Sequence, residues 1–152
     1  MNLYLIQHGK AKSKEEDPER SLSDQGLEEV QKVSAWSARM GLSVGEIRHS
    51  GKKRAEQTAE IFAEKIKPNR GIAAVTGLGP MDDVNPVAEA LNREEENLML
   101  IGHLPFLSRL TSRLITGDPD IPIVRFGNAG IVCLIHEDSQ WIIDWYVTPA
   151  FL

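Results

Sequence analysis

Two short apolar runs, residues 3–6 and 97–101, are the most strongly predicted strands of the chain. Neither run alternates with polar residues, which is typical of strands buried on both faces of a parallel sheet. Each run ends in a histidine turn, Gln7-His8-Gly9 after the first and Gly102-His103 after the second. Ligands gather outside the carboxyl ends of such strands. We therefore expect both histidines at one ligand-binding edge, where Gly9 lets the chain turn sharply and a ligand approach closely.

Apolar residues at helical spacing predict helices over 23–40, 52–67, 86–92 and 104–115. Weaker strand signals lie at 44–49 and 73–78, and the charged segment 10–20 predicts an exposed loop. Two runs at 131–136 and 141–147, joined by a short polar link, predict an antiparallel hairpin. Strands alternating with helices before a terminal hairpin predict a three-layer α/β/α sandwich with a mostly parallel central sheet.

The length of 152 residues fits a single domain spanning 1–152. No run of about 18 apolar residues is present to cross a membrane. The apolar stretch after Met1 is too short for a secretion signal and lacks a preceding basic segment. These features predict a cytoplasmic protein.

A net charge of −5 argues against partners such as nucleic acid or an anionic membrane. Any positive charge that binds an anion must therefore be local. The single cysteine, Cys133, excludes an internal disulfide and a cysteine-based metal cluster, and its apolar run favours a buried, inert thiol. The four histidines lack the i, i+4 spacing of a zinc helix, so we expect neither a metal nor another cofactor.

Three side chains predict phosphate chemistry at the histidine edge. Arg54 falls in the first turn of a predicted helix that follows a strand, so it points toward the same edge as His8 and His103. A guanidinium matches phosphate oxygens, and a neutral imidazole is a competent nucleophile for phosphorus. Positive charge at Arg54 should also lower the pKa of His8 and keep it neutral.

The chain carries four motifs and a tryptophan-rich terminal hairpin. The motifs are Gln7-His8-Gly9, Arg20-Ser21-Leu22-Ser23-x-x-Gly26, Ser50-x-x-x-Arg54-Ala55-x-Gln57-Thr58-Ala59 and Ile101-Gly102-His103-x-Pro105. Taken together, these features resemble the histidine phosphatase superfamily, which has a phosphoglycerate mutase-like fold, and the resemblance covers nearly the whole chain. The short length, the direct Arg-Ala-Glu-Gln-Thr helix and the Gly-His-Leu-Pro turn look most like the bacterial SixA-type phosphohistidine phosphatases.

The resemblance implies a metal-independent phosphatase in which His8 is the nucleophile and becomes transiently phosphorylated. The implied substrate is a phosphohistidine on a phosphotransfer domain of two-component signalling, and inorganic phosphate is the product. Arg54 and His103 would complete the catalytic set. The implied phosphate-binding residues are Gln7, Gly9, Arg20, Arg54 and His103.

The first motif departs from the family pattern, because Gln7 stands where family members usually carry arginine. The glutamine amide keeps an NH₂ donor, but it loses the positive charge and the forked pair of donors of a guanidinium. By analogy with the removal of one oxyanion-hole donor, this loss lowers the rate by a factor of order 10²–10³. Three interpretations follow: a weak enzyme, an enzyme compensated by Arg20, Lys10 or Lys12, or a phosphate-binding pseudophosphatase. A phosphatase of small phosphate esters is a further alternative.

The general acid is less clearly marked. Asp83, next to Asp82, lies in a Gly/Pro-rich connection from which a donor can enter the pocket, and it is the candidate acid. The alternative is a solvated turn carboxylate. No insertion long enough to cover the pocket is evident, so the sequence predicts an open site that suits a protein substrate better than a small one.

Overall fold

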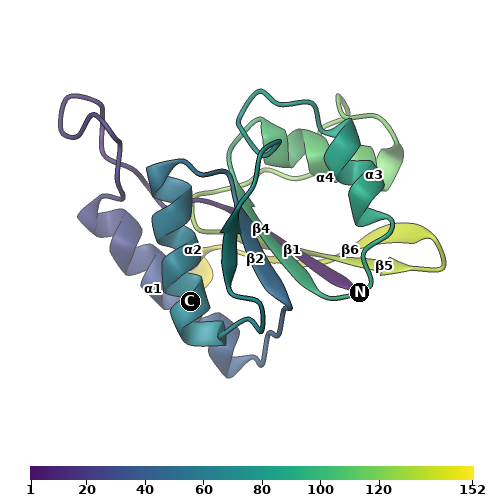
Figure 1. The fold of residues 1–152 in the computed structure, drawn as a ribbon, viewed down its shortest axis with the longest axis horizontal. Helices are drawn as coiled ribbons and strands as arrows, with labels where there is room; N and C mark the ends of the chain where they lie inside the picture. Colours follow the sequence, from purple (N-terminus) through teal and green to yellow (C-terminus); the bar gives the residue numbers. More distant parts are fainter.

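The computed structural model describes residues 1–152 as one six-stranded sheet with helices on both faces (Figure 1). The strand order is β3-β2-β4-β1-β5-β6, in which β3, β2, β4 and β1 run parallel and β5 and β6 are antiparallel. The elements are β1 (Asn2–Gln7), α1 (Asp24–Arg39), β2 (Glu46–His49), α2 (Lys53–Ile66), β3 (Ile72–Ala74), α3 (Asn85–Leu91), β4 (Leu98–Gly102), α4 (Phe106–Thr116), β5 (Ile131–Glu137), β6 (Gln140–Val147) and a terminal 3₁₀ turn, η1 (Pro149–Phe151).

Strand β1 divides the apolar core into two clusters, one on each face of the sheet. Leu3 and Leu5 pack with residues of α3 and α4, whereas Tyr4 and Ile6 pack with residues of α1 and α2. In Figure 1 the two helix pairs lie on opposite sides of the sheet. Successive side chains of a strand point to opposite faces, so an unbroken apolar run in β1 serves both layers. The three-layer α/β/α architecture is therefore confirmed.

Most predicted elements form, with shifts at their ends. Helices α1 and α2 lie within a residue of their predicted bounds, and the Ser23 side chain caps α1 by accepting from the Gly26 N–H at 3.1 Å. The strand predicted over 73–78 is wrong in extent, because β3 covers only Ile72–Ala74 at the sheet margin, where it pairs with β2 alone. Helix α4 begins two residues later than predicted, at Phe106. None of the helices has the combination of length and apolarity needed to cross a bilayer.

The hairpin carries a β-bulge that the sequence did not indicate. Cys133 pairs with Trp145 and the adjacent Leu134 pairs with Ile143, so Asp144 is an extra residue in β6. A bulge reverses the alternation of side chains beyond it. Trp141 consequently packs in the α3/α4 layer, while Trp145 packs on the α1/α2 side, 6.0 Å from the ring of Tyr4. Both tryptophans are packing residues of the core.

The turn after β1 packs tightly onto α1. A Cβ added to Gly9 would lie 2.6 Å from a methyl carbon of Val30, and a Cβ added to Gly26 would lie 2.1 Å from the carbonyl oxygen of Lys10. Both distances are far shorter than van der Waals contact. The missing side chains therefore allow the segment that follows His8 to lie directly against the first turns of α1.

Replacing Gly26 by alanine should destabilise the protein, although alanine is normally the better helix residue. The new methyl group meets backbone, which cannot rotate away, so we expect a loss of about 1–3 kcal/mol in the free energy of unfolding. Urea denaturation measures this loss. Gly102→Ala is the matched control, since its Cβ would have no neighbour closer than 3.6 Å. Equal stability of the two variants would contradict the packing argument.

Candidate active site

The carboxyl ends of β1 and β4 bring the two predicted histidines together. These strands are neighbours, with Gln7 paired to Gly102, so the residues that follow them emerge side by side. The ring centroids of His8 and His103 lie 4.9 Å apart. Arg54 reaches the same point from the first turn of α2, and the three side chains line a cavity of about 340 Å³. The predicted convergence of the three groups is thus present.

Hydrogen bonds select one tautomer of His8. Its Nδ1 lies 2.6 Å from the carbonyl oxygen of Gly9, which can only accept, so Nδ1 carries the proton. The Nε–H of Arg54 donates to Nε2 of His8 at 3.3 Å, so Nε2 holds the lone pair. The imidazole is therefore neutral, with its nucleophilic nitrogen directed toward the arginine.

Both histidines resist protonation. Burial is the largest cause that lowers the pKa of His8 to about 4, and the positive charges of Arg54 and Arg20 lower it further, against the hydrogen bond to Gly9. Burial also lowers the pKa of His103 to about 3, with His8, Arg54, Lys52 and Arg20 adding to the effect. The influence of Arg54 on His8 was predicted, but exclusion of water contributes more.

His103 is held by a residue whose contact was not predicted. The hydroxyl of Ser50 lies 2.6 Å from Nε2 of His103, and Nδ1 of the same ring is buried with no partner in the protein. Ser50 directly follows β2, the other neighbour of β4 in the sheet. An unpaired buried ring nitrogen is unfavourable, and the ring that carries it lines the cavity beside His8.

The start of α2 joins three parts of the site. Thr58 Oγ1 accepts from the buried N–H of Gly9 at 3.1 Å and donates to the Arg54 carbonyl at 2.8 Å. Gln57 accepts from the N–H of Leu22 at 2.7 Å, which anchors the end of the long loop after β1. The first turn of α2 therefore fixes the segment that carries His8, the loop that carries Arg20, and the backbone of Arg54.

The loop after β1 presents Arg20 to the cavity. Arg20 lines the cavity and has a left-handed backbone with φ of 52°, and its Nε donates to the Lys12 carbonyl at 3.1 Å. The carboxylate of Asp17 accepts from the N–H groups of Glu19 at 3.0 Å and Ser21 at 3.1 Å. These contacts hold the loop in the one conformation that directs a second guanidinium at the site.

The remaining predicted residues differ in position. Gln7 lines the cavity, and its Oε1 is buried without a hydrogen-bond partner. Lys10 also lines the cavity and donates to Gln25 at 3.2 Å. Gly9 is not among the residues that line the cavity, and its N–H donates to Thr58. Asp83 lines a different cavity and accepts from the N–H of Asn85 at 3.0 Å, so the structure does not bring it to the histidines.

Two cavity residues had no signal in the sequence. The side-chain amide of Asn128, in the loop before β5, donates to the carbonyl oxygen of His8 at 3.0 Å across 120 residues of sequence. Pro80 enters from the connection between β3 and α3. Both lie in irregular segments, where periodicity gives no information about contacts distant in sequence.

Two neighbouring strands of this α/β sheet thus end in two histidines, which share one cavity with two arginines. Residues 3–78, half of the chain, match the family model of the histidine phosphatase superfamily (branch 1), so this chain belongs to that superfamily. Among curated protein sequences none matches the chain.

Several solved structures share the fold along nearly the whole chain. The protein histidine phosphatase SixA, complexed with tungstate, has a TM-score of 0.87 and 22% identity over 99% of both chains. A candidate SixA from Agrobacterium tumefaciens has a TM-score of 0.77 and 20% identity over 97% of both chains. A mutant phosphoserine phosphatase from Entamoeba histolytica, in complex with phosphoserine, has a TM-score of 0.77 and 14% identity, covering 99% of this chain and 98% of the other. Identities this low show a common fold.

The lowered histidine pKa values predict how stability depends on pH. Between the ordinary pKa of 6.5 and the folded-state values of about 4 for His8 and about 3 for His103, the unfolded chain binds more protons than the folded one. The free energy of unfolding should therefore be largest above pH 6.5 and decrease toward pH 4. Chemical denaturation across this range should show a shallower decrease for His8→Asn. Identical slopes would mean that His8 is not protected from protonation.

Removing the Ser50 hydroxyl should release the His103 ring. We expect Ser50→Ala to alter the tautomer balance of His103, visible in the ¹⁵N chemical shifts of its imidazole, while the helical signal and melting temperature change little. Ser50→Thr keeps a hydroxyl and should preserve the native shifts. Unchanged shifts in Ser50→Ala would show that the ring is oriented by packing alone.

Proposed function

We propose that this protein is a metal-independent phosphohistidine phosphatase that acts on a phosphorylated partner protein through a transient phosphohistidine at His8. The neutral His8 imidazole carries the proposal, because its lone pair sits on Nε2 beside Arg54 and its pKa is about 4. Such a group needs no prior deprotonation at neutral pH. The fold shared with the tungstate complex of SixA supports an oxyanion as the ligand of this pocket.

The proposed first step transfers the phosphoryl group to His8. An oxygen of the phosphoryl group takes the N–H of Arg54, which frees the lone pair of Nε2. Nε2 then forms a bond to phosphorus while the P–N bond to the substrate imidazole breaks, and the electron pair of that bond stays on the leaving nitrogen. Because the other ring nitrogen of the substrate carries a proton, the imidazole departs as a neutral group. Arg54, Arg20 and His103 line the cavity, and in this proposal they stabilise the charge on the phosphoryl oxygens.

In the second step water attacks the phosphorus of phospho-His8. The N–P bond breaks, inorganic phosphate leaves, and the imidazole returns to its neutral form with the proton on Nδ1. The hydrogen bond from Nδ1 to the Gly9 carbonyl persists through both steps, so it keeps Nε2 aimed at phosphorus. A phosphoramidate with a protonated nitrogen is a good leaving group, and the reaction therefore depends less on a dedicated acid such as Asp83.

The glutamine at position 7 favours an enzyme that is slower than one with arginine there. The second candidate function is a protein that binds phosphate without turnover. The Gln7 amide lacks a charge, and its buried Oε1 accepts no hydrogen bond from the protein. A half-turn about the last side-chain torsion would direct the NH₂ group at an anion instead. Arg20 and Lys10 line the same cavity and supply positive charge that Gln7 does not. A phosphatase of small esters remains the alternative for the same chemistry.

The decisive measurement is phosphate release from a phosphohistidine protein, with a chelator present, by the native chain, His8→Ala and Gln7→Arg. We expect turnover by the native chain, none by His8→Ala, and a gain of about 10–10³-fold for Gln7→Arg, because a charged fork replaces one neutral donor. Gln7→Lys is a matched control that adds charge without the fork, and it should gain less.

Each contrary result has a definite meaning. A native chain as inactive as His8→Ala, with activity only in Gln7→Arg, would identify a phosphate-binding pseudophosphatase. Loss of activity on chelation would exclude the metal-independent mechanism. A strong preference for sugar phosphates over the phosphoprotein would select the small-ester alternative.

A further inference from the structure

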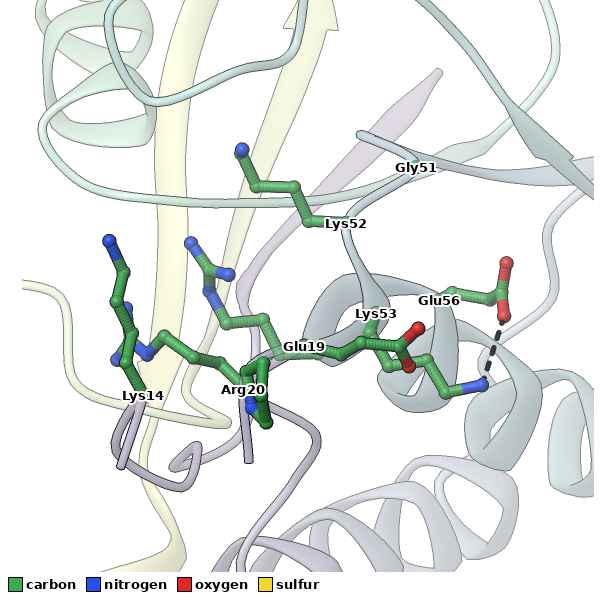
Figure 2. Close-up of a pocket in the computed structure, with 9 residues that line it drawn as sticks. Lys14, Glu19, Arg20, Gly51, Lys52, Lys53 and Glu56 are labelled. Carbon is green, nitrogen blue, oxygen red and sulfur yellow. Dashed lines mark ion pairs between the residues drawn. The ribbon is translucent and has the colours of Figure 1, made fainter. Parts of the chain in front are cut away.

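A second cavity adjoins the cavity around His8 and His103, which we call the phosphate pocket. Apart from two shared arginines, its residues have no part in the mechanism above. It has a volume of about 700 Å³ and no hydrophobic residue lines it (Figure 2). We call it the basic trough. Arg20 and Arg54 belong to both cavities, so the trough begins where the phosphate pocket ends. Its lining is Lys14, Pro18, Glu19, Arg20, Gly51, Lys52, Lys53, Arg54 and Glu56.

The trough concentrates positive charge on an acidic protein. Five of its nine lining residues are lysine or arginine and two are glutamate, whereas the whole chain has a net charge of −5. Like charges placed close together repel each other, so such a cluster is unfavourable without a counter-charge. Positive potential that stands alone on a negative surface also attracts anionic ligands selectively to that place.

Most of this charge is not neutralised within the chain. Only Lys53 has an acidic partner in the trough, Glu56, at 3.6 Å. In Figure 2 Lys53 turns toward Glu56, whereas Lys14 and Arg20 lie on the left and the Lys52 side chain ends above them, away from Glu56. No carboxylate lies within ion-pair distance of these three. They therefore form the part of the trough that is available to an external anion.

The loop that builds this side of the trough is ordered by its own contacts. Lys14 and Arg20 both belong to the segment between β1 and α1, where Asp17 holds the backbone of Glu19 and Ser21. Lys52 belongs to the opposite wall, directly before α2. The cations thus face one another across the trough from two fixed segments, and an occupant would contact both.

We propose that the basic trough binds an acidic segment of the phosphorylated partner protein, next to the phosphohistidine held in the pocket. This proposal rests on the proposed function and names the surface chemistry of its substrate. A lining without apolar residues offers no place for a buried hydrophobic side chain, but it suits carboxylates that stay hydrated. The shared arginines place those carboxylates close to the phosphoryl group in the same molecule.

The test compares matched phosphohistidine peptides whose flanking residues are glutamate in one and glutamine in the other, with free phosphohistidine as a substrate that has no flanks. The native chain should show a higher kcat/KM for the glutamate peptide, through a lower KM, and the advantage should shrink with added salt. Lys14→Glu and Lys52→Glu should each reduce that advantage by roughly fivefold or more. Lys14→Glu should turn over free phosphohistidine at the native rate. Because Lys52 acts on the pKa of His103, the preference of Lys52→Glu is measured against its own rate on free phosphohistidine.

Lys32→Glu is the control, because it makes the same change of charge at an exposed position of α1 outside the trough. It should keep the native preference. Equal kcat/KM for the two peptides, or an equal loss in Lys32→Glu, would overturn the proposal. So would a preference for a sugar bisphosphate over its monophosphate without any preference for the acidic peptide, since the second anion would then belong to a small molecule.

Binding separates this proposal from the proposed function. If the native chain hydrolyses none of these substrates, the function fails, and fluorescence anisotropy with an unphosphorylated glutamate peptide still tests the trough. Salt-sensitive binding by the native chain and Lys32→Glu, weakened in Lys14→Glu and Lys52→Glu, would support the trough independently. Equal binding by all four proteins would refute it.

Discussion

The buried hydrogen bond from the N–H of Gly9 to Thr58 Oγ1 holds the site together. It fixes the turn after β1 against the first turns of α2, and thereby sets His8 against Arg54. A buried N–H without a partner is unfavourable, so the pairing also resists local opening. The close approach leaves little room for water, and loss of water is the main reason that the pKa of His8 is low. One short contact thus links the geometry of the site to its protonation state.

The sequence predicts the parts of this arrangement that depend on strands and helices. The predicted strands at residues 3–6 and 97–101 correspond to the neighbouring parallel strands β1 and β4, so His8 and His103 meet. The helix after β2 begins at Lys53, which places Arg54 in its first turn beside them. These predictions succeed because burial and periodicity determine regular elements. The N-cap at Ser23 and the residues at which the helices end also follow from local rules.

Long-range contacts between irregular segments lie beyond those rules. The hydrogen bond of Asn128 to the His8 carbonyl joins a loop to a turn far away in the sequence, and no local pattern encodes it. Asp83 illustrates the converse, because a favourable place in the sequence did not bring its carboxylate to the cavity. The sequence indicates that Gly9 lets a ligand approach closely. In the structure the missing side chain of Gly9 leaves room for Val30 of α1.

The bulge at Asp144 has a consequence for the outer margin of the sheet. Strand β6 is an edge of eight residues, and a long regular edge is a template on which another chain can add a strand. The extra residue breaks the regular spacing of the edge and places an exposed carboxylate on it. The same irregularity that sends Trp145 to the opposite core layer therefore also makes this edge a poorer template for the addition of a strand from another molecule.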